Sequence, residues 1–524
     1  MIPERGDRLL PAVSALLAVC AFPPFHLLFP SFVALVPLAL WVADCQVSHR
    51  AFRGGVWFGV LYFGVLLYWI PIALAGFTWW AVPAYVAVVV LLAFGAGGFA
   101  WALFRLTHGG GLPLWVALPL TWTALEWIRA HAPGGLAFPW LGLGTSLTGY
   151  PELVGAAELV GARGITLWLA LLNGLTAEAV RAARARDGAR ASLRRAAAFA
   201  VVLAVPAAWG YWRAETLPVR AIGEVAVVQP NVAARVRLDR LQSNDSTAVS
   251  LTRLALDNSG PPPDLVVWPE MTFFGSIESD RPLRERVAEV AGRWRAPVVF
   301  GAIGETVVPG RAPVPMNSAF LMDREGRLGD FRYDKHRLVP VVENTPFRRG
   351  GWREGGVEVD SYGAGVDWIL GEMGGGVRFG VLICYESTYA SHARRLRLEG
   401  ADFFLNLTND GWFGQETWYT RTTALWQHPA HLVMRAIEHR VGVARAANTG
   451  ISFFVDPLGV VYGETDLFQA AVRSETVYTS DVMTWYTRTG DMAGWTALVL
   501  TLGLLAMSRP RVGSSTPRPT HGPA

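Results

Sequence analysis

The sequence predicts a polytopic α-helical membrane domain joined to an α/β domain, and three observations lead to this fold class. Of the 524 residues, 52% are hydrophobic and only 17% are charged, whereas roughly 25% are charged in an ordinary soluble protein. Long apolar stretches fill the first 213 residues and return at 491–508. Between them, residues 214–490 alternate β-branched runs with amphipathic stretches, a pattern typical of α/β domains.

Eight apolar stretches come near the roughly 20 residues that a helix needs to cross the hydrocarbon core of a bilayer. They lie at 9–26, 29–45, 55–75, 80–104, 113–130, 160–180, 196–213 and 493–508. We therefore expect a membrane domain of about seven spans over 1–213 and a last span within 491–508. Residues 509–524, rich in Pro, Ser and Arg, are predicted to be a disordered cytoplasmic tail.

Basic residues predict the orientation of these spans. They precede the first span and follow the second, fourth, sixth and eighth, so that with eight spans every basic loop lies on one side. The largest cluster follows the sixth span and comprises Arg181, Arg184, Arg186, Arg190, Arg194 and Arg195. Loops rich in Lys and Arg stay in the cytoplasm, so we expect 214–490 to face outward. There it has no access to ATP or cytosolic acyl-CoA, which favours membrane lipids or exported proteins as substrates.

Seven strands and two helices are predicted within 214–490. The strands are 225–229, 265–268, 297–301, 318–322, 379–383, 403–407 and 451–455, and the helices are 281–295 and 417–440. Turn residues at 323–326 and 456–459 predict two hairpins. Sheets with helices on their faces bind ligands beyond the strand ends, so residues that follow strands are the candidate site residues. The sequence contains no nucleic-acid-binding motif, and no nucleic-acid partner is expected.

Three side chains that could cooperate in acyl transfer lie near such positions. Cys384 directly follows an apolar run, Glu270 follows another run after a proline, and Lys335 stands among charged residues. A cysteine becomes a nucleophile when a nearby base or cation favours its thiolate. Taken singly, a core thiol, a surface glutamate and a solvated lysine are the ordinary interpretations. The other cysteines, Cys20 and Cys45, lie in or beside apolar segments, where a buried thiol is expected.

The order and spacing of these residues resemble the nitrilase superfamily, whose members use a Glu-Lys-Cys triad on an αββα sandwich. The matching motifs are VVWPE ending in Glu270, YDKHRLVP containing Lys335 and VLICYE containing Cys384. With membrane spans on both sides, the chain resembles the apolipoprotein N-acyltransferase family within that superfamily. Further matches are LEWIR at 125–129, FPW at 138–140, VQPN at 228–231, MNS at 316–318 and NDGWFG at 409–414. The resemblance implies that 214–490 form a nitrilase-like αββα sandwich. It also implies that the protein resides in the inner membrane of a diderm bacterium.

The resemblance also implies ping-pong acyl transfer. Glu270 would remove the thiol proton of Cys384, and Lys335 would stabilise the oxyanion formed when the thiolate attacks a phospholipid ester. The amine of a diacylglyceryl-cysteine at the N-terminus of an exported apolipoprotein would then attack the acyl-thioester and complete lipoprotein maturation. Phosphatidylethanolamine or a similar lipid is the implied donor. No metal and no organic cofactor is implied, and a monomer is expected.

Four more residues match positions that the family keeps near the triad. Glu343 and Glu386 are expected to orient Lys335 or the incoming amine, with simple charge balance as the alternative. Tyr385 is expected to shape the acyl pocket or to close the oxyanion site, with ordinary aromatic packing as the alternative. Asn317 is expected to hydrogen-bond near the site, although asparagine is also common in turns.

Two aromatic residues in a glycine-flanked loop, Trp412 and Phe413, are expected to control substrate access as a lid or as lipid contacts, with core anchoring as the alternative. Leu238 stands where the family commonly has a tryptophan, so an acceptor-binding role of that aromatic is in doubt. Residues 346–376 are rich in glycine and are expected to form a mobile arm near the membrane, or an ordinary long surface loop.

Two other functions remain open from the sequence. A membrane-anchored nitrilase-type amidase would use the same triad with water as the acceptor, although anchoring alone needs fewer spans. A transporter or scaffold with an inactive outer domain is the other alternative. Charged residues are scarce in the spans, with Glu126 and Arg129 as the main candidates, and a substrate pathway normally contains more.

Overall fold

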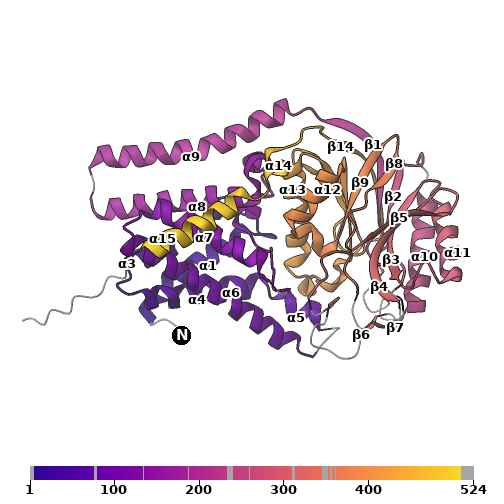
Figure 1. The fold of residues 1–524 in the computed structure, drawn as a ribbon, viewed down its shortest axis with the longest axis horizontal. Coiled ribbons are helices and arrows are strands. Elements are labelled where there is room, and N and C mark those ends of the chain that lie inside the picture. The colour runs from indigo at the N-terminus through magenta and orange to yellow at the C-terminus, as the bar shows by residue number, and fades with distance from the viewer. Residues whose placement is uncertain are drawn as a thin grey trace, which may run out of the picture.

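The computed structural model describes residues 5–508 except for 76–78, 134, 187, 233–239, 259, 308, 310–312, 341, 345–351, 355–356 and 360–361. Up to Thr216 the chain is largely helical (Figure 1). The main helices are α1 (Leu9–Ala21), α2 (Leu28–Val33), α3 (Val36–Asp44), α4 (Ser48–Leu66), α5 (Trp69–Leu74), α6 (Ala81–Phe104), α7 (Leu114–His131), α8 (Ala157–Arg184), α9 (Ala189–Thr216) and, near the C-terminus, α15 (Met492–Met507). Each of the eight predicted apolar segments therefore contains helix.

Three helices in the described part of the chain are long and apolar enough to cross a membrane. They are Ala81–Gly109, in which a π-helical turn extends α6, together with Ala157–Arg184 and Ala189–Thr216. Proline sets one end of two shorter helices. Helix α1 ends before Pro23, and α3 starts with Pro37 in its first turn, where the missing N–H is tolerated. The count of eight spans stays a prediction.

Helices α4 and α6 pack closely because α4 presents glycines to α6. A Cβ added to Gly59 would lie 2.6 Å from the Cα of Ala93, and one added to Gly55 would lie 2.5 Å from the carbonyl oxygen of Ala96. Small residues let helix backbones approach each other in this way in membrane proteins. The contact fixes α6, whose N-terminal half lines the cavity described below.

Residues 220–479 contain two six-stranded sheets. The first has the order β14-β1-β2-β3-β4-β5 and comprises β14 (Ala471–Thr479), β1 (Arg220–Gln229), β2 (Leu265–Val267), β3 (Val298–Thr306), β4 (Val314–Met322) and β5 (Leu328–Asp334). The second has the order β13-β12-β11-β10-β9-β8 and comprises β13 (Val461–Tyr462), β12 (Phe453–Val455), β11 (Gly442–Ala447), β10 (Phe403–Thr408), β9 (Val377–Ile383) and β8 (Gly371–Gly374). A separate hairpin pairs β6 (Trp352–Glu354) with β7 (Val357–Val359).

The two sheets pack face to face, and helices cover their outer faces. Side chains alternate along a strand, so Val225 and Val227 of β1 enter the core between the sheets while Ala226 and Val228 enter a second core on the other face. That second core lies under α10 (Arg240–Asp257) and α11 (Arg281–Gly292), and α12 (Ala390–Glu399) and α13 (Ala424–His439) cover the other sheet. The expected nitrilase-like αββα sandwich is confirmed.

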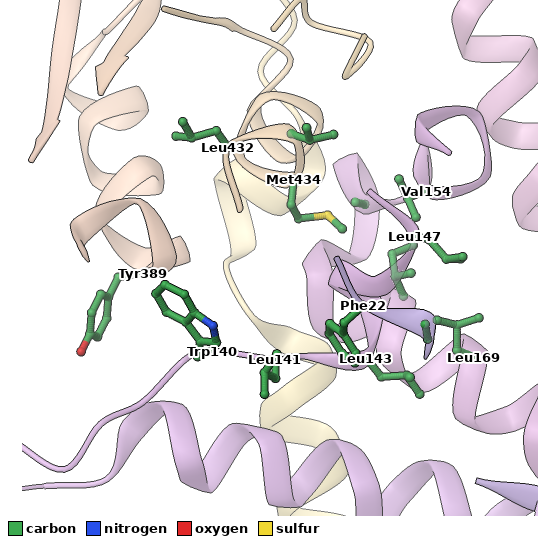
Figure 2. Close-up of a cluster of buried hydrophobic side chains, with 14 of the residues drawn as sticks. Phe22, Trp140, Leu141, Leu143, Leu147, Val154, Leu169, Tyr389, Leu432 and Met434 are labelled. Carbon is green, nitrogen blue, oxygen red and sulfur yellow. The ribbon is translucent and has the colours of Figure 1, made fainter. Parts of the chain in front are cut away.

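The helices and the sandwich share one hydrophobic core. Figure 2 shows Phe22, Leu143 and Leu147 of the helical part in the same buried cluster as Leu432 and Met434 of α13. Polar contacts reinforce the junction: Arg440 donates to Glu158 at 2.8 Å, Trp140 donates to Gln427 at 2.9 Å, and the backbone N–H of Ala162 donates to Glu438 at 2.8 Å. The sandwich is therefore built onto the helices rather than tethered to them.

Some predicted elements differ from the observed ones. The helix expected at 417–440 begins at Ala424, because the preceding residues are mostly threonine and aromatic residues that form helices poorly. The strand expected at 451–455 begins at Phe453. The predicted hairpins are confirmed, since 323–326 joins β4 to β5 and 456–459 joins β12 to β13. Strands β5, β8, β11 and β14 and helices α10 and α12 were not predicted.

Candidate active site

The structure brings Glu270, Lys335 and Cys384 together at one end of the sandwich. Lys335 directly follows β5, Cys384 directly follows β9, and Glu270 follows β2 after Trp268 and Pro269. Because β2 and β5 belong to one sheet and β9 to the other, the ends of two facing sheets supply the three side chains. Glu270 and Lys335 are buried, whereas Cys384 keeps some exposure.

Lys335 lies between two carboxylates. Its Nζ donates to Glu270 Oε1 at 2.9 Å and to Glu343 Oε1 at 2.8 Å. Burial alone would lower the pKa of Lys335, but the two carboxylates outweigh burial and raise the pKa well above its ordinary value. An ammonium group has three hydrogens, so these two bonds leave one hydrogen for a substrate oxygen. Lys335 is therefore a cation beside the thiol.

A buried asparagine holds the same two carboxylates. Asn317 Nδ2 donates to Glu270 Oε1 at 2.9 Å and to Glu343 Oε1 at 2.8 Å. The second oxygen of Glu270 accepts the backbone N–H of Asn409 at 3.2 Å, and that of Glu343 accepts the backbone N–H of Val339 at 2.7 Å. Both oxygens of each carboxylate are thus bonded, which fixes the direction of each one. Asn317 and Glu343 lie where the sequence predicted them, next to the triad.

Cys384 occupies a left-handed turn with a φ of 48°, a conformation uncommon for any residue but glycine. It is also the first residue of a short 3-10 helix, Cys384–Thr388. Burial raises the pKa of Cys384, Glu270 raises it further and Lys335 lowers it, with a net increase. The thiol is therefore protonated at rest, and a base must remove its proton during attack.

Glu386 is bonded differently from Glu343, because its hydrogen bonds come from backbone groups and a tyrosine and not from Lys335. It accepts hydrogen bonds from the backbone N–H groups of His336, Arg337 and Ile383 and from the hydroxyl of Tyr333, at 2.6, 3.2, 2.8 and 3.1 Å respectively. Burial raises the pKa of Glu386 to about 7, even though the backbone N–H groups act to lower it. Glu386 therefore joins the turn after Lys335 to the turn that carries Cys384.

A cavity of about 340 Å³ opens onto these residues. Its walls come from the sandwich, from α5 and α6, and from segment 135–140 between α7 and α8. The lining includes Trp69, Ile70, Ala73, Leu74, Ala84, Val88, Leu91, Leu92, Leu136, Phe138, Trp140, Glu270, Lys335, Glu343, Cys384, Tyr385, Trp412 and Phe413. Tyr385 donates through its hydroxyl to the carbonyl of Ala137 at 3.2 Å, and Trp69 packs edge-on against Phe413 at 5.1 Å. The predicted pocket and access residues all contact this one cavity.

The remaining predicted features are described only in part. Leu238 lies outside the described residues, as does the tail 509–524. In segment 346–376, the ring of Trp368 stacks on His336 at 4.2 Å. Within the described chain, no group of three or more His, Cys, Asp or Glu side chains could hold a metal ion.

A histidine on α13 that was not predicted as a site residue contacts the turn that carries Cys384. His428 Nε2 lies 3.1 Å from the carbonyl oxygen of Cys384, and His428 Nδ1 lies 3.0 Å from Asp410 Oδ1. Asp410 also forms an ion pair with Arg445 of β11. Asp410 belongs to the NDGWFG motif, but nothing in the spacing of the three residues indicates that they meet.

Comparison with known proteins covers both parts of the chain. A model described as the apolipoprotein N-acyltransferase N-terminal domain matches residues 14–175, and a carbon-nitrogen hydrolase model matches residues 224–486. The apolipoprotein N-acyltransferase of Geobacter metallireducens is 30% identical over 506 residues, covering 94% of this chain and 93% of the relative. That of Chlorobaculum tepidum is 28% identical over 534 residues, covering 95% of each chain.

Among solved structures, an amidase of the nitrilase superfamily from Nesterenkonia is 19% identical, with a TM-score of 0.37, and covers 52% of this chain and 95% of its own. The full-length relatives match the helical part and the sandwich together, in one chain. We conclude that the chain belongs to the apolipoprotein N-acyltransferase family, a family of membrane acyltransferases within the nitrilase superfamily.

Proposed function

We propose that this protein transfers a fatty acyl chain from a phospholipid to the N-terminal amine of a diacylglyceryl-cysteine on an exported apolipoprotein. The observation that carries the proposal is the cavity of about 340 Å³, which has apolar walls from α5 and α6 and the side chains of Glu270, Lys335 and Cys384 in its lining. A lipid chain in such a cavity stays in apolar surroundings while its ester reaches the thiol.

In the first half-reaction, Glu270 removes the thiol proton as Cys384 Sγ attacks the ester carbonyl carbon. Lys335 keeps its proton and uses its third hydrogen to donate a hydrogen bond to the carbonyl oxygen as that oxygen becomes negative. When the tetrahedral intermediate collapses, the C–O bond breaks and the lysophospholipid leaves with the proton that Glu270 held. The acyl chain remains on Cys384 as a thioester.

In the second half-reaction, the neutral amine of the acceptor attacks the thioester carbonyl. Glu270 takes a proton from the attacking nitrogen and gives it to the departing Sγ, which forms the amide and restores the thiol. Amines attack thioesters readily, and an amide replaces an ester over the full cycle, so the reaction needs no ATP. Glu343 and Asn317 keep Lys335 and Glu270 aligned through both steps.

Intact-mass measurement of the purified protein in detergent tests the first half-reaction. The protein is incubated with phosphatidylethanolamine and no acceptor, alongside Cys384→Ala. We expect an adduct of acyl mass on the wild-type protein only, released by hydroxylamine and by a diacylglyceryl-cysteine peptide, with the acyl chain recovered on that peptide.

Other outcomes would contradict the proposal in distinct ways. Free fatty acid without a transferable adduct would indicate a hydrolase that uses water as the acceptor. An adduct that forms equally on Cys384→Ala would exclude Cys384 as the nucleophile. Transport activity that survives in Cys384→Ala would favour the transporter alternative.

We also propose that the sandwich faces the periplasmic side of the inner membrane, with 1–213 as the membrane domain, 214–490 as the catalytic domain and 491–508 as the last span. In Figure 1, the C-terminal end of α8 and the N-terminal end of α9 lie away from the sandwich. These helix ends carry arginines of the basic cluster, and basic segments stay in the cytoplasm. A membrane-impermeant maleimide should label Glu325→Cys in intact spheroplasts but Arg190→Cys only after lysis, and the reverse pattern would refute the orientation.

A further inference from the structure

We propose that His428, held by Asp410, is a positioning residue that fixes the nucleophile turn of Cys384. The inference rests on the proposed function only in treating Cys384 as the nucleophile. His428 is 1% exposed and lies on α13, which packs between the second sheet and α8. Its ring also lines the cavity.

The contacts on one side of the ring belong to the nucleophile turn. His428 Nε2 lies 3.1 Å from the carbonyl oxygen of Cys384 and 3.1 Å from Ser387 Oγ, and Ser387 Oγ itself donates to the same carbonyl at 2.9 Å. A carbonyl oxygen can only accept, so the ring holds this turn when Nε2 carries a hydrogen. The carbonyl oxygen of Cys384 thus contacts two neighbouring side chains, one from its own turn and one from α13.

The contacts on the other side anchor the ring. Asp410 Oδ1 lies 3.0 Å from His428 Nδ1 and accepts from Thr408 Oγ1 at 3.1 Å, while its second oxygen pairs with Arg445, which also bonds Asn406. Burial alone would raise the pKa of Asp410, but Arg445 and His428 outweigh it and bring the pKa to about 2. Asp410 is therefore a carboxylate, and it holds the ring of His428 through Nδ1.

A third contact links the ring to the helical part of the protein. The indole of Trp140, from the segment between α7 and α8, stacks on His428 at 5.6 Å with an interplanar angle of 20°. Trp140 and His428 both line the cavity. The ring therefore lies between the acyl cavity, a buried ion pair and the backbone of the nucleophile.

The nucleophile turn needs such support because of its backbone. Cys384 has a φ of 48°, and a non-glycine residue keeps this conformation only where its surroundings impose it. If the carbonyl is released, the turn can relax, and Sγ then moves away from Glu270 and Lys335. Glu270 is the proposed base for the thiol proton, so a thiol displaced from it loses that base and reacts more slowly.

Three variants separate the two sides of the ring. In His428→Gln the amide reaches as far as Nε2 and can still donate to the carbonyl of Cys384. In His428→Asn the shorter amide can face Asp410 but does not reach Cys384, and in His428→Ala both contacts are lost. His431→Gln is the matched control, because His431 lies one turn along the same helix, is buried and packs against the same Trp140 at 5.3 Å.

Two rates are measured for each variant: alkylation of Cys384 by iodoacetamide, located by mass spectrometry, and acyl-enzyme formation from phosphatidylethanolamine. We expect both rates to fall about tenfold or more in His428→Asn and His428→Ala, while KM for the lipid changes by less than about threefold. In His428→Gln and His431→Gln, both rates should stay within about threefold of the wild-type rates. Thermal unfolding in detergent confirms that each variant is folded.

Three results would overturn the inference. The first is wild-type rates in His428→Ala, and the second is equal losses in His428→Gln and His428→Asn. The third is a loss in His431→Gln as large as that in His428→Ala, which would assign the effect to a loosened α13. Alkylation needs no lipid. If the wild-type protein is alkylated but forms no acyl adduct, the proposed function fails, and the alkylation rates alone still decide the role of His428.

Discussion

Replacing Lys335 with methionine should destabilise the protein in a pH-dependent way. Methionine has a similar volume but no charge, so the variant leaves the carboxylates of Glu270 and Glu343 facing each other in a buried site. Both carboxylates accept from the same nitrogen of Asn317, at 2.9 and 2.8 Å, so their bonded oxygens lie within about 6 Å of each other. At an effective dielectric constant of about 20, that separation corresponds to a repulsion of about 3 kcal/mol.

Protonation of one of the two carboxylates removes the repulsion. Above the ordinary glutamate pKa of about 4.3, the folded variant therefore holds a proton that the unfolded chain has lost. With more protons bound in the folded state, stability falls as pH rises. The loss relative to wild type should be about 3 kcal/mol at pH 8 and about 1 kcal/mol at pH 5.

Thermal unfolding of both proteins in detergent at pH 5 and pH 8 measures this loss. The double variant Lys335→Met/Glu343→Gln restores the charge balance of the site, so it should recover most of the stability at pH 8 while acyl-enzyme formation stays abolished. The reasoning would be refuted if Lys335→Met were as stable as the double variant at pH 8, or if its loss did not depend on pH.

Three further predictions test the base, the cavity and the helix packing. Glu270→Gln should slow acyl-enzyme formation by about 10²- to 10⁴-fold in a burst assay, since no base remains for the thiol, and an unchanged burst would exclude this role. Val88→Trp narrows the cavity and should slow acylation by long-chain lipids more than by short-chain esters, whereas Val90→Trp, on exposed helix surface, should show no chain-length effect. Gly59→Leu should lower thermal stability by about 1–3 kcal/mol through overpacking against α6, while Gly98→Ala, with no atom within 4 Å, should not.

Two of the three candidate catalytic residues were predictable because they follow strands that are plain in the sequence. The runs before Glu270 and Cys384 are continuous apolar segments, and the structure ends β2 and β9 at Val267 and Ile383. Lys335 was found only through its motif, since β5 (LGDFRYD) mixes polar and apolar residues and was not predicted as a strand. Local pattern therefore located two of the three residues, and family resemblance supplied the third.

The support behind Cys384 was not predictable, because its charges are buried by partners far away in sequence. In β11, Arg445 interrupts an apolar run and argues against a core strand, yet it is fully buried because Asp410 and Asn406 bond it from neighbouring segments. On α13, His428 and Glu438 lie on what reads as a solvent-facing side. That side instead packs against the helical part, which no local pattern indicates.

The position of the cavity explains why an acyltransferase of this kind carries so many helices. Here α5, α6 and segment 135–140 form the apolar part of the cavity, so the helices supply binding surface as well as a membrane anchor. Trp140 stacks on His428 and donates to Gln427, both on α13, which joins the cavity wall built by the helices to the helix that contacts the turn of Cys384. Under the two proposals above, an acyl chain that fills the cavity would touch the same aromatic residue that packs on His428, so the lipid tail and the thiol would be aligned together.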